Sequence, residues 1–137
     1  GNPFKIIIMI PITELQIGNR ILYNGLEAIV YSITGAYPSK VERFNNKPTI
    51  DLVLGGLITA TEDELEPIIL TKEIFDKLDN FEYKYNAYWF EGVDFQDFKS
   101  NNEWVCFPLF DAIDAPLISS LHELQNIILF LRKKQIL

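Results

Sequence analysis

Two short apolar runs separated by Asn24-Gly25 dominate the pattern of the first fifty residues. An Asn-Gly pair in that position favours a hairpin turn of type I′, because both central residues of such a turn need a positive φ. The turn fixes the register, with Tyr23 opposite Leu26. Apolar residues then fall on both faces of the pair, so the pattern predicts a curled sheet or small barrel that is covered on its outer side as well.

The rest of the first eighty residues reads as short strands followed by one helix. A loop is expected over residues 35–39, where Gly35 and Pro38 break the pattern. Thr71 is placed to cap the helix. The expected elements are strands over 4–10 and 57–60, a second hairpin of strands 41–44 and 49–54, and a helix over 71–78.

Aromatic residues set the second part of the chain apart. The pattern predicts a three-stranded meander over residues 81–90, 93–98 and 103–110, since aromatic and β-branched residues favour strands. Packing in a core or an interface is the expected use of these aromatic side chains. Ser120 and Glu123 fit a capping box, which predicts a helix from residue 121 to about residue 134.

These elements predict an α+β fold: a small twisted antiparallel sheet or SH3-like barrel, an aromatic β-meander, and a C-terminal helix packed on the sheet as a cover for the hairpin. A chain of 137 residues suits a single domain over 1–137. A subdivision into 1–80 and 81–137 stays open, because the strand pattern changes near residue 81.

The net charge of −7 is unevenly distributed, and residues 51–114 hold fifteen acidic and four basic residues. A balance of −11 over this stretch would repel a nucleic-acid duplex, because such binding depends on Lys and Arg contacts to phosphate. The single cysteine, Cys106, excludes an internal disulfide framework and indicates a reducing compartment, so we expect a cytoplasmic protein. The apolar run at 4–10 is too short to span a membrane, and no membrane association is expected.

Three sequence blocks occur in a familiar order: Glu14 to Asn19 (ELQIGN), Pro67 to Ile74 (PIILTKEI) and Leu121 to Asn126 (LHELQN). Together they resemble a family of small uncharacterised proteins encoded by prophages and mobile elements of gut anaerobic bacteria. The resemblance covers about a third of the chain. It implies a mobile-element context and no particular activity, ligand or cofactor. The chain departs from the family in its residues before Met9 and in its basic C-terminal end.

The C-terminal helix predicts two contact faces. At about 100° per residue one stripe holds leucine and isoleucine, while a second flank holds polar residues followed by apolar ones. A helix that faces only one core needs no apolar residue on the second flank, so we expect that flank to bind another part of the fold, a second subunit or a partner. The alternative is that its polar residues hydrogen-bond nearby loop backbone. The predicted binding residues are His122, Gln125, Asn126, Leu129 and Phe130.

Candidates for catalysis are weaker. Ser120 and His122 are two residues apart on a helix and do not face each other, which argues against a nucleophile and base. A hard cation would need several acidic oxygens in one place, and the spacing of the acidic residues matches no known loop. Solvated loop acids are the plainer interpretation. The acidic candidates are Glu91, Asp94, Asp97, Asp111 and Asp114.

We therefore expect a non-catalytic accessory or interaction protein of a phage or mobile element, whose partner is a protein or a second copy of the chain. No cofactor or metal is expected, and nucleic acid is not the expected partner. Two alternatives remain open. A nucleic-acid-associated small barrel requires one basic strip of Arg20, Lys40, Arg43 and Lys47. A hydrolase requires a pocket lined by at least two of the loop aspartates.

Overall fold

The Asn24-Gly25 turn organises the first sheet of this computed structural model, which describes residues 9–97, 103–107 and 116–137. Asn24 and Gly25 have φ angles of 50° and 77°, as a type I′ turn requires. The turn joins β1 (Arg20–Tyr23) to β2 (Leu26–Tyr37), with Tyr23 opposite Leu26. The predicted hairpin and its register are confirmed.

The chain divides into two compact units, residues 1–68 (unit 1) and 69–137 (unit 2). The division lies before the 80/81 boundary considered from the sequence, because residues 69 and 70 join the second part of the chain. Ile69 bridges Ser120, and the Trp104 Nε1 donates a hydrogen bond to the Leu70 carbonyl at 3.0 Å. The interpretation of residues 1–137 as a single domain stays a prediction.

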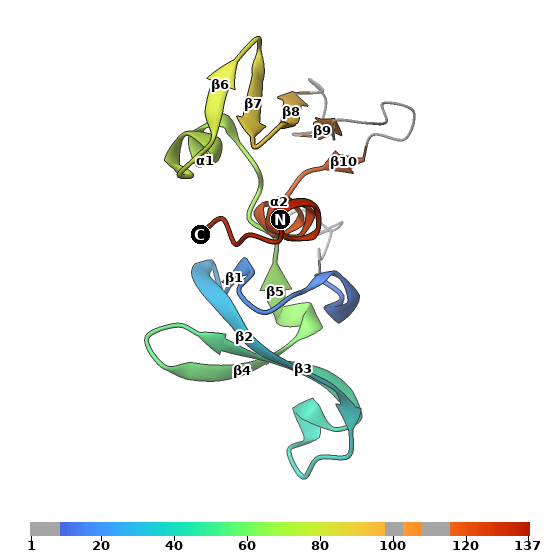
Figure 1. The fold of residues 1–137 in the computed structure, drawn as a ribbon. Coiled ribbons are helices and arrows are strands. Elements are labelled where there is room, and N and C mark those ends of the chain that lie inside the picture. The colour runs from blue at the N-terminus through green and yellow to red at the C-terminus, as the bar shows by residue number, and fades with distance from the viewer. Residues whose placement is uncertain (1–8, 98–102, 108–115) are drawn as a thin grey trace, which may run out of the picture. The chain divides into compact units, whose positions relative to one another are not determined.

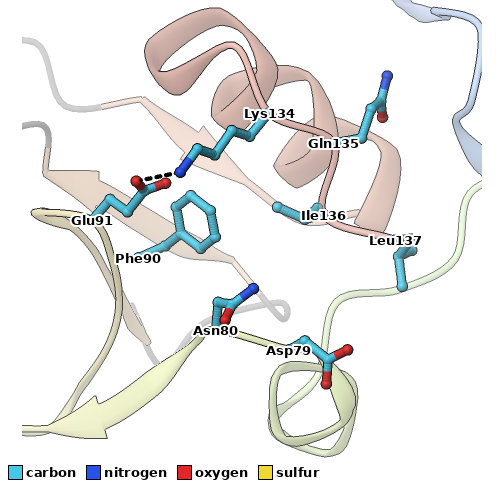
Figure 2. A pocket seen from close by; sticks show the side chains of 8 residues that line it. All are labelled: Asp79, Asn80, Phe90, Glu91, Lys134, Gln135, Ile136 and Leu137. Atoms are coloured by element: carbon cyan, nitrogen blue, oxygen red, sulfur yellow. Dashed lines mark hydrogen bonds and ion pairs between the residues drawn. The ribbon is translucent and has the colours of Figure 1, made fainter.

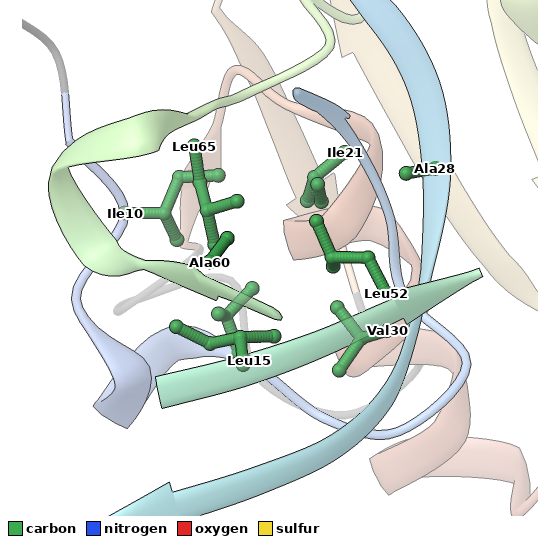
Figure 3. Packing of buried hydrophobic residues seen from close by; sticks show 9 residues of the cluster. Ile10, Leu15, Ile21, Ala28, Val30, Leu52, Ala60 and Leu65 are labelled. Atoms are coloured by element: carbon green, nitrogen blue, oxygen red, sulfur yellow. The ribbon is translucent and has the colours of Figure 1, made fainter. Parts of the chain in front are cut away.

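Unit 1 is a strongly curled five-stranded antiparallel sheet with the strand order β4-β3-β2-β1-β5 (Figure 1). Its remaining strands are β3 (Lys47–Val53), β4 (Leu57–Thr61) and β5 (Leu65–Glu66). The concave side encloses an aliphatic core of buried residues (Figure 3): Ile10, Leu15, Ile21, Ala28, Val30, Ile50, Leu52, Ala60 and Leu65. A curled sheet closed over such a core is the barrel-like part of the predicted α+β fold.

The predicted second hairpin is wrong in its first strand. Residues 42–44 form a 3-10 helix (Glu42–Phe44), and β2 runs on through Gly35 to pair with β3 as far as Tyr37 opposite Lys47. The ladder shifts register between Thr34 and Tyr37, so the glycine lies in a bulge and does not end the strand. The predicted loop at 35–39 therefore begins only after Tyr37.

Of the remaining predictions for unit 1, the strand near residue 57 is confirmed and the strand before residue 11 is not. The strand expected at 57–60 is β4, and the bend before it lies at Gly55-Gly56. Short 3-10 helices occur at Ile12–Glu14 and at Glu62–Glu64, where Thr61 and Glu64 form a capping box. The strand predicted over 4–10 lies mostly outside the described residues. Ile10 is buried in the core of unit 1 and is not in a strand.

Unit 2 consists of a second five-stranded antiparallel sheet, order β10-β9-β8-β7-β6, and two helices (Figure 1). Its elements are α1 (Lys72–Lys77), β6 (Glu82–Lys84), β7 (Ala87–Phe90), β8 (Val93–Asp97), β9 (Trp104–Phe107), β10 (Leu117–Ile118) and α2 (Leu121–Arg132). Thr71 caps α1, as predicted, by accepting a hydrogen bond from the Ile74 backbone N–H.

The predicted single strand over 81–90 is in fact a hairpin of β6 and β7. Its turn is Tyr85-Asn86, with φ angles of 52° and 60°. Asparagine tolerates the left-handed region, but tyrosine rarely adopts it. Because Tyr85 also continues the aromatic pattern of the strand, the sequence did not indicate a turn there. Glu91-Gly92 forms the turn between β7 and β8, and residues 98 and 108–110 of the predicted meander lie outside the described residues.

Aromatic rings form the core of unit 2. Phe75 of α1 stacks on Tyr88 with ring centroids 4.5 Å apart. The ring centroid of Trp104 lies 4.7 Å from that of Phe75. Phe95 is fully buried beside them. Burial raises the pKa of the Tyr88 hydroxyl, which donates to the Asp76 carboxylate at 2.7 Å. Within the aromatic run of the sequence, Tyr88 and Phe90 are buried in this core, whereas Tyr83 and Tyr85 are exposed, so the predicted packing role holds for part of the run.

The C-terminal helix begins and ends close to the predicted residues. The Ser120 hydroxyl accepts from the Glu123 backbone N–H, but the Glu123 carboxylate accepts from the backbone N–H of Ser119 and not from that of Ser120. The helix ends where Lys133 adopts a left-handed φ of 56°. Arg132 Nε donates to the Glu91 carbonyl at 2.9 Å, which ties α2 to the β7–β8 turn. The expectation that this helix packs over the Asn24-Gly25 hairpin stays a prediction.

Candidate functional site

The predicted binding flank of α2 changes from buried to exposed along the helix. His122 and Gln125 are buried, and Asn126 and Leu129 are half-buried. Phe130 is 84% exposed. Of the five predicted binding residues, Phe130 therefore offers the largest accessible side chain.

His122 is buried without a hydrogen-bond partner for either ring nitrogen within the described part of the chain. For His122, the alternative of hydrogen bonds to nearby loop backbone is therefore wrong within the described residues. Burial lowers the pKa of the imidazole, and the neighbouring Glu123 carboxylate opposes this shift. The ring is consequently neutral at pH 7, and its unpaired polar atoms cost stability.

Phe130 lies one turn beyond Asn126 and is followed by the exposed Lys133 and Lys134. The Lys134 ammonium group lies 2.7 Å from Glu91 Oε1, whereas the Lys133 side chain is solvent-exposed. Phe130 and the exposed Lys133 together form what we call the Phe130 surface, which offers a large apolar ring and a positive charge.

A pocket of about 440 Å³ lies beside the end of α2 (Figure 2). Phe90 and Ile136 give it an apolar wall, and Figure 2 shows the Glu91–Lys134 ion pair at one side. Its lining residues are Asp79, Asn80, Phe90, Glu91, Lys134, Gln135, Ile136 and Leu137. Apolar walls with carboxylate and amide groups at the rim can hold a small polar molecule or a side chain of a partner.

Left-handed backbone occurs at two lining residues of this pocket and at the residue that precedes a third, Lys134. Asn80, Glu91 and Lys133 have φ angles of 70°, 45° and 56°. Glu91 is held by two contacts, from Arg132 Nε to its carbonyl and from Lys134 to its carboxylate. Such non-glycine conformations persist where surrounding contacts fix them, and they are frequent at binding sites.

The acidic candidates do not converge in the described residues. Asp94 is buried and accepts a hydrogen bond from the Gln96 amide at 3.0 Å, while Asp97 is exposed and Glu91 pairs with Lys134. Asp111 and Asp114 lie outside the described residues. No group of three metal-ligating side chains occurs in the described ranges.

Three of the four basic residues proposed as a strip, Arg20, Arg43 and Lys47, have acidic neighbours in unit 1. Arg20 pairs with Glu27 at 3.0 Å, and Arg43 pairs with Glu64 at 3.2 Å. Lys47 lies close enough to Asp63 to help lower the pKa of that carboxyl, although a hydrogen bond from Thr61 is the larger cause. Much of the positive charge required for phosphate contacts is thus balanced locally.

Ser120 and His122 are engaged separately. Ser120 donates to the Glu123 carboxylate at 2.7 Å and caps the helix, while His122 is buried. The sequence argument that they do not act as nucleophile and base agrees with these positions.

The pocket beside α2 was missed from the sequence. Its lining comes from three segments, 79–80, 90–91 and 134–137, and side chains from such distant segments carry no shared periodic signal. The one available indication was the cluster of turn signals at Asp79-Asn80 and Glu91-Gly92, which are typical of loop junctions.

Comparison of the chain with protein-family models, with curated proteins and with solved structures found no match. In residues 9–97, 103–107 and 116–137, no helix has both the length and the apolar character that crossing a bilayer requires.

Proposed function

We propose that this chain is a non-catalytic accessory protein of a phage or mobile element, which acts in the cytoplasm by binding another protein through the Phe130 surface. The observation that supports the proposal is the 84% exposure of Phe130 on a helix whose other apolar residues are buried or half-buried. A large aromatic side chain at such a position is typical of a binding anchor. The mobile-element context and the SH3-like nature of unit 1 belong to the same proposal.

The neighbouring charges define the chemistry of the partner. Lys133, three residues after Phe130 at the C-terminal cap of α2, is exposed, and Lys134 follows it in an ion pair with Glu91. The partner is therefore expected to present an apolar recess with acidic residues at its rim, because opposite charges at the rim direct association. Two of the residues considered for catalysis have structural contacts: Ser120 caps α2, and Glu91 pairs with Lys134.

Affinity capture tests the proposal. The full chain is immobilised and exposed to a lysate of a gut anaerobic bacterium, and captured proteins are quantified for the wild type, Phe130→Ala and Leu57→Ala. Leu57 is the matched control, since it is an exposed apolar residue of unit 1. We expect Phe130→Ala to lower capture of a specific protein by about tenfold or more, as loss of an anchor residue does.

Leu57→Ala is expected to capture as much as the wild type. Equal capture by the wild type and Phe130→Ala would contradict the proposal. So would a loss caused by Leu57→Ala alone.

A further inference from the structure

The outer edge of the second sheet is formed by β6, and all three of its residues are exposed. Among the strands of the described residues, β6 pairs with β7 alone. The β4 edge of the first sheet differs, because one of its backbone groups is already occupied: Arg43 Nη2 donates to the Thr59 carbonyl at 3.0 Å. An exposed strand edge is a template for pairing with another chain.

The turn determines which backbone groups of β6 face outward. Lys84 and Ala87 flank the two-residue turn Tyr85-Asn86, and in such a turn the first carbonyl accepts from the fourth N–H. The groups of Lys84 thus point toward β7. Because this direction alternates along an antiparallel strand, the N–H and C=O of Tyr83 point away from β7.

The side chains of β6 are arranged symmetrically about Tyr83. Glu82 precedes it and Lys84 follows it, and their charged groups lie 3.6 Å apart. The Tyr83 ring is 53% exposed and lies 4.8 Å from that of Tyr88. Tyr85, in the turn, is 85% exposed. When two copies of Glu82-Tyr83-Lys84 are aligned antiparallel, each charged residue lies opposite a residue of the opposite charge.

We propose that β6 pairs antiparallel with β6 of a second copy of this chain, about a twofold axis at Tyr83. Tyr83 then faces Tyr83 of the second copy, and the two residues exchange two backbone hydrogen bonds. Glu82 faces Lys84 of the second copy, and Lys84 faces Glu82. The interface is isologous, and it joins the two aromatic sheets into one.

Only this register satisfies the charges and keeps the new backbone hydrogen bonds within β6. An axis at Glu82 or at Lys84 places two like charges opposite each other, which is unfavourable. Either axis also pairs the outward backbone groups of Tyr83 with those of Phe81 or Tyr85 of the second copy, which lie outside β6. Charged residues on an edge usually discourage pairing, but here they favour one arrangement.

A three-residue edge buries little surface, so the dimer is weak and depends on concentration. The inference goes beyond the proposed function, because it uses a different surface and a different partner. Loss of dimerisation leaves capture through Phe130 unaffected, so the two proposals fail separately.

Sedimentation equilibrium of the full chain tests the pairing, from about 10 µM to about 1 mM, a range suited to a small interface. Salt is held at about 0.15 M to screen the overall negative charge. The wild type is expected to shift from the monomer mass toward the dimer mass. Lys84→Glu alone and Glu82→Lys alone are expected to stay at the monomer mass, since each places like charges across the axis.

Charge exchange provides the decisive comparison. An equimolar mixture of Lys84→Glu and Glu82→Lys is expected to regain the mass shift, and so is the double variant E82K/K84E. Lys77→Glu, an equal charge change at an exposed site on α1, is the control and is expected to behave as the wild type. Circular dichroism checks that each variant is folded.

A wild type that stays at the monomer mass throughout overturns the proposal. Single variants that associate as strongly as the wild type overturn it as well, and so does a mixture that fails to recover.

Discussion

The two units build their cores from different side chains. Unit 1 encloses aliphatic residues in a curled sheet, whereas unit 2 packs aromatic rings between short strands and helices. Aromatic rings fill space with few side chains, but their edges and polar tips extend toward the surface. The same residue class therefore supplies both the core of unit 2 and the most exposed large hydrophobic side chains among its described residues, Tyr85 and Phe130.

The hairpin turns of the two units also differ in the residues that form them. Unit 1 uses Asn24-Gly25, the residue pair that tolerates positive φ best, whereas unit 2 uses Tyr85-Asn86 in a similar conformation. Tyr85 accepts a left-handed conformation at a cost in energy while its ring is 85% exposed. Unit 1 is thus locally relaxed at its turn, and unit 2 holds an exposed aromatic ring in a strained one.

Phe75→Ala is expected to have the largest effect. Phe75 is buried and contacts Tyr88 and Trp104 at ring-centroid distances of 4.5 and 4.7 Å. Its removal is expected to lower the free energy of unfolding by about 3–5 kcal/mol. Both tryptophans of the chain lie in unit 2, so urea titration followed by tryptophan fluorescence measures this loss.

Phe75→Leu leaves a smaller cavity and is the matched control, with a smaller loss expected. An unchanged fluorescence midpoint in Phe75→Ala would show that the aromatic cluster does not hold unit 2 together.

Leu52→Ala is the corresponding change in unit 1. Leu52 is fully buried in the aliphatic core, and its truncation is expected to cost about 2–5 kcal/mol. Because each unit forms its core from its own residues, the midpoint measured by far-UV circular dichroism is expected to shift more than the fluorescence midpoint. Equal shifts in both signals would mean that the two cores do not unfold as separate structures.

Much of unit 1 could be predicted from the sequence, because one strong turn signal and regular alternation specify it. The Asn24-Gly25 pair fixed the register of β1 and β2. The error at residues 41–44 arose because Gly35 was interpreted as a break when a bulge accommodates it. A bulge depends on the partner strand, which a local pattern does not describe.

Unit 2 was predicted less completely. The capped helices were located from Thr71 and Ser120, since a cap is a local signal. The hairpin at Tyr85-Asn86 was missed because tertiary packing outweighs the preference of tyrosine. The two-sided helix suggested a binding flank, but burial of His122 and exposure of Phe130 depend on packing between distant segments.

His122→Leu is expected to have a moderate, pH-dependent effect. Burial lowers the pKa of His122, so below about pH 6.5, the ordinary value, the unfolded chain binds a proton more readily than the folded chain. His122 therefore lowers stability progressively as the pH falls below that value. The variant is expected to be more stable than the wild type by about 1 kcal/mol at pH 7.5, since it removes unpaired buried polar atoms.

The advantage of His122→Leu is expected to increase at pH 5, as measured by urea denaturation at both pH values. His122 is the only histidine of the chain, so the difference between the two curves isolates its contribution. Parallel pH profiles for the two proteins would contradict the burial argument.

Tyr85→Asn is expected to have the smallest effect. Asparagine adopts a left-handed φ more readily than tyrosine, so the variant is expected to gain about 0.5–1 kcal/mol by fluorescence-detected unfolding. Asn24→Tyr, the opposite change at the turn of unit 1, is the matched comparison and is expected to lose a similar amount by circular dichroism. A loss of stability in Tyr85→Asn would mean that the exposed ring contributes contacts to unit 2.

The central claim is that unit 2 presents the binding surface through Phe130. Hydroxyl-radical footprinting of the full chain, alone and with the protein it captures, tests this claim most directly. Oxidation of Phe130 is expected to fall by about tenfold on binding, as for a residue at the centre of an interface, while oxidation of Tyr31 and Leu57 in unit 1 stays constant. Unchanged oxidation of Phe130, with protection of Tyr31 or Leu57, would contradict the claim.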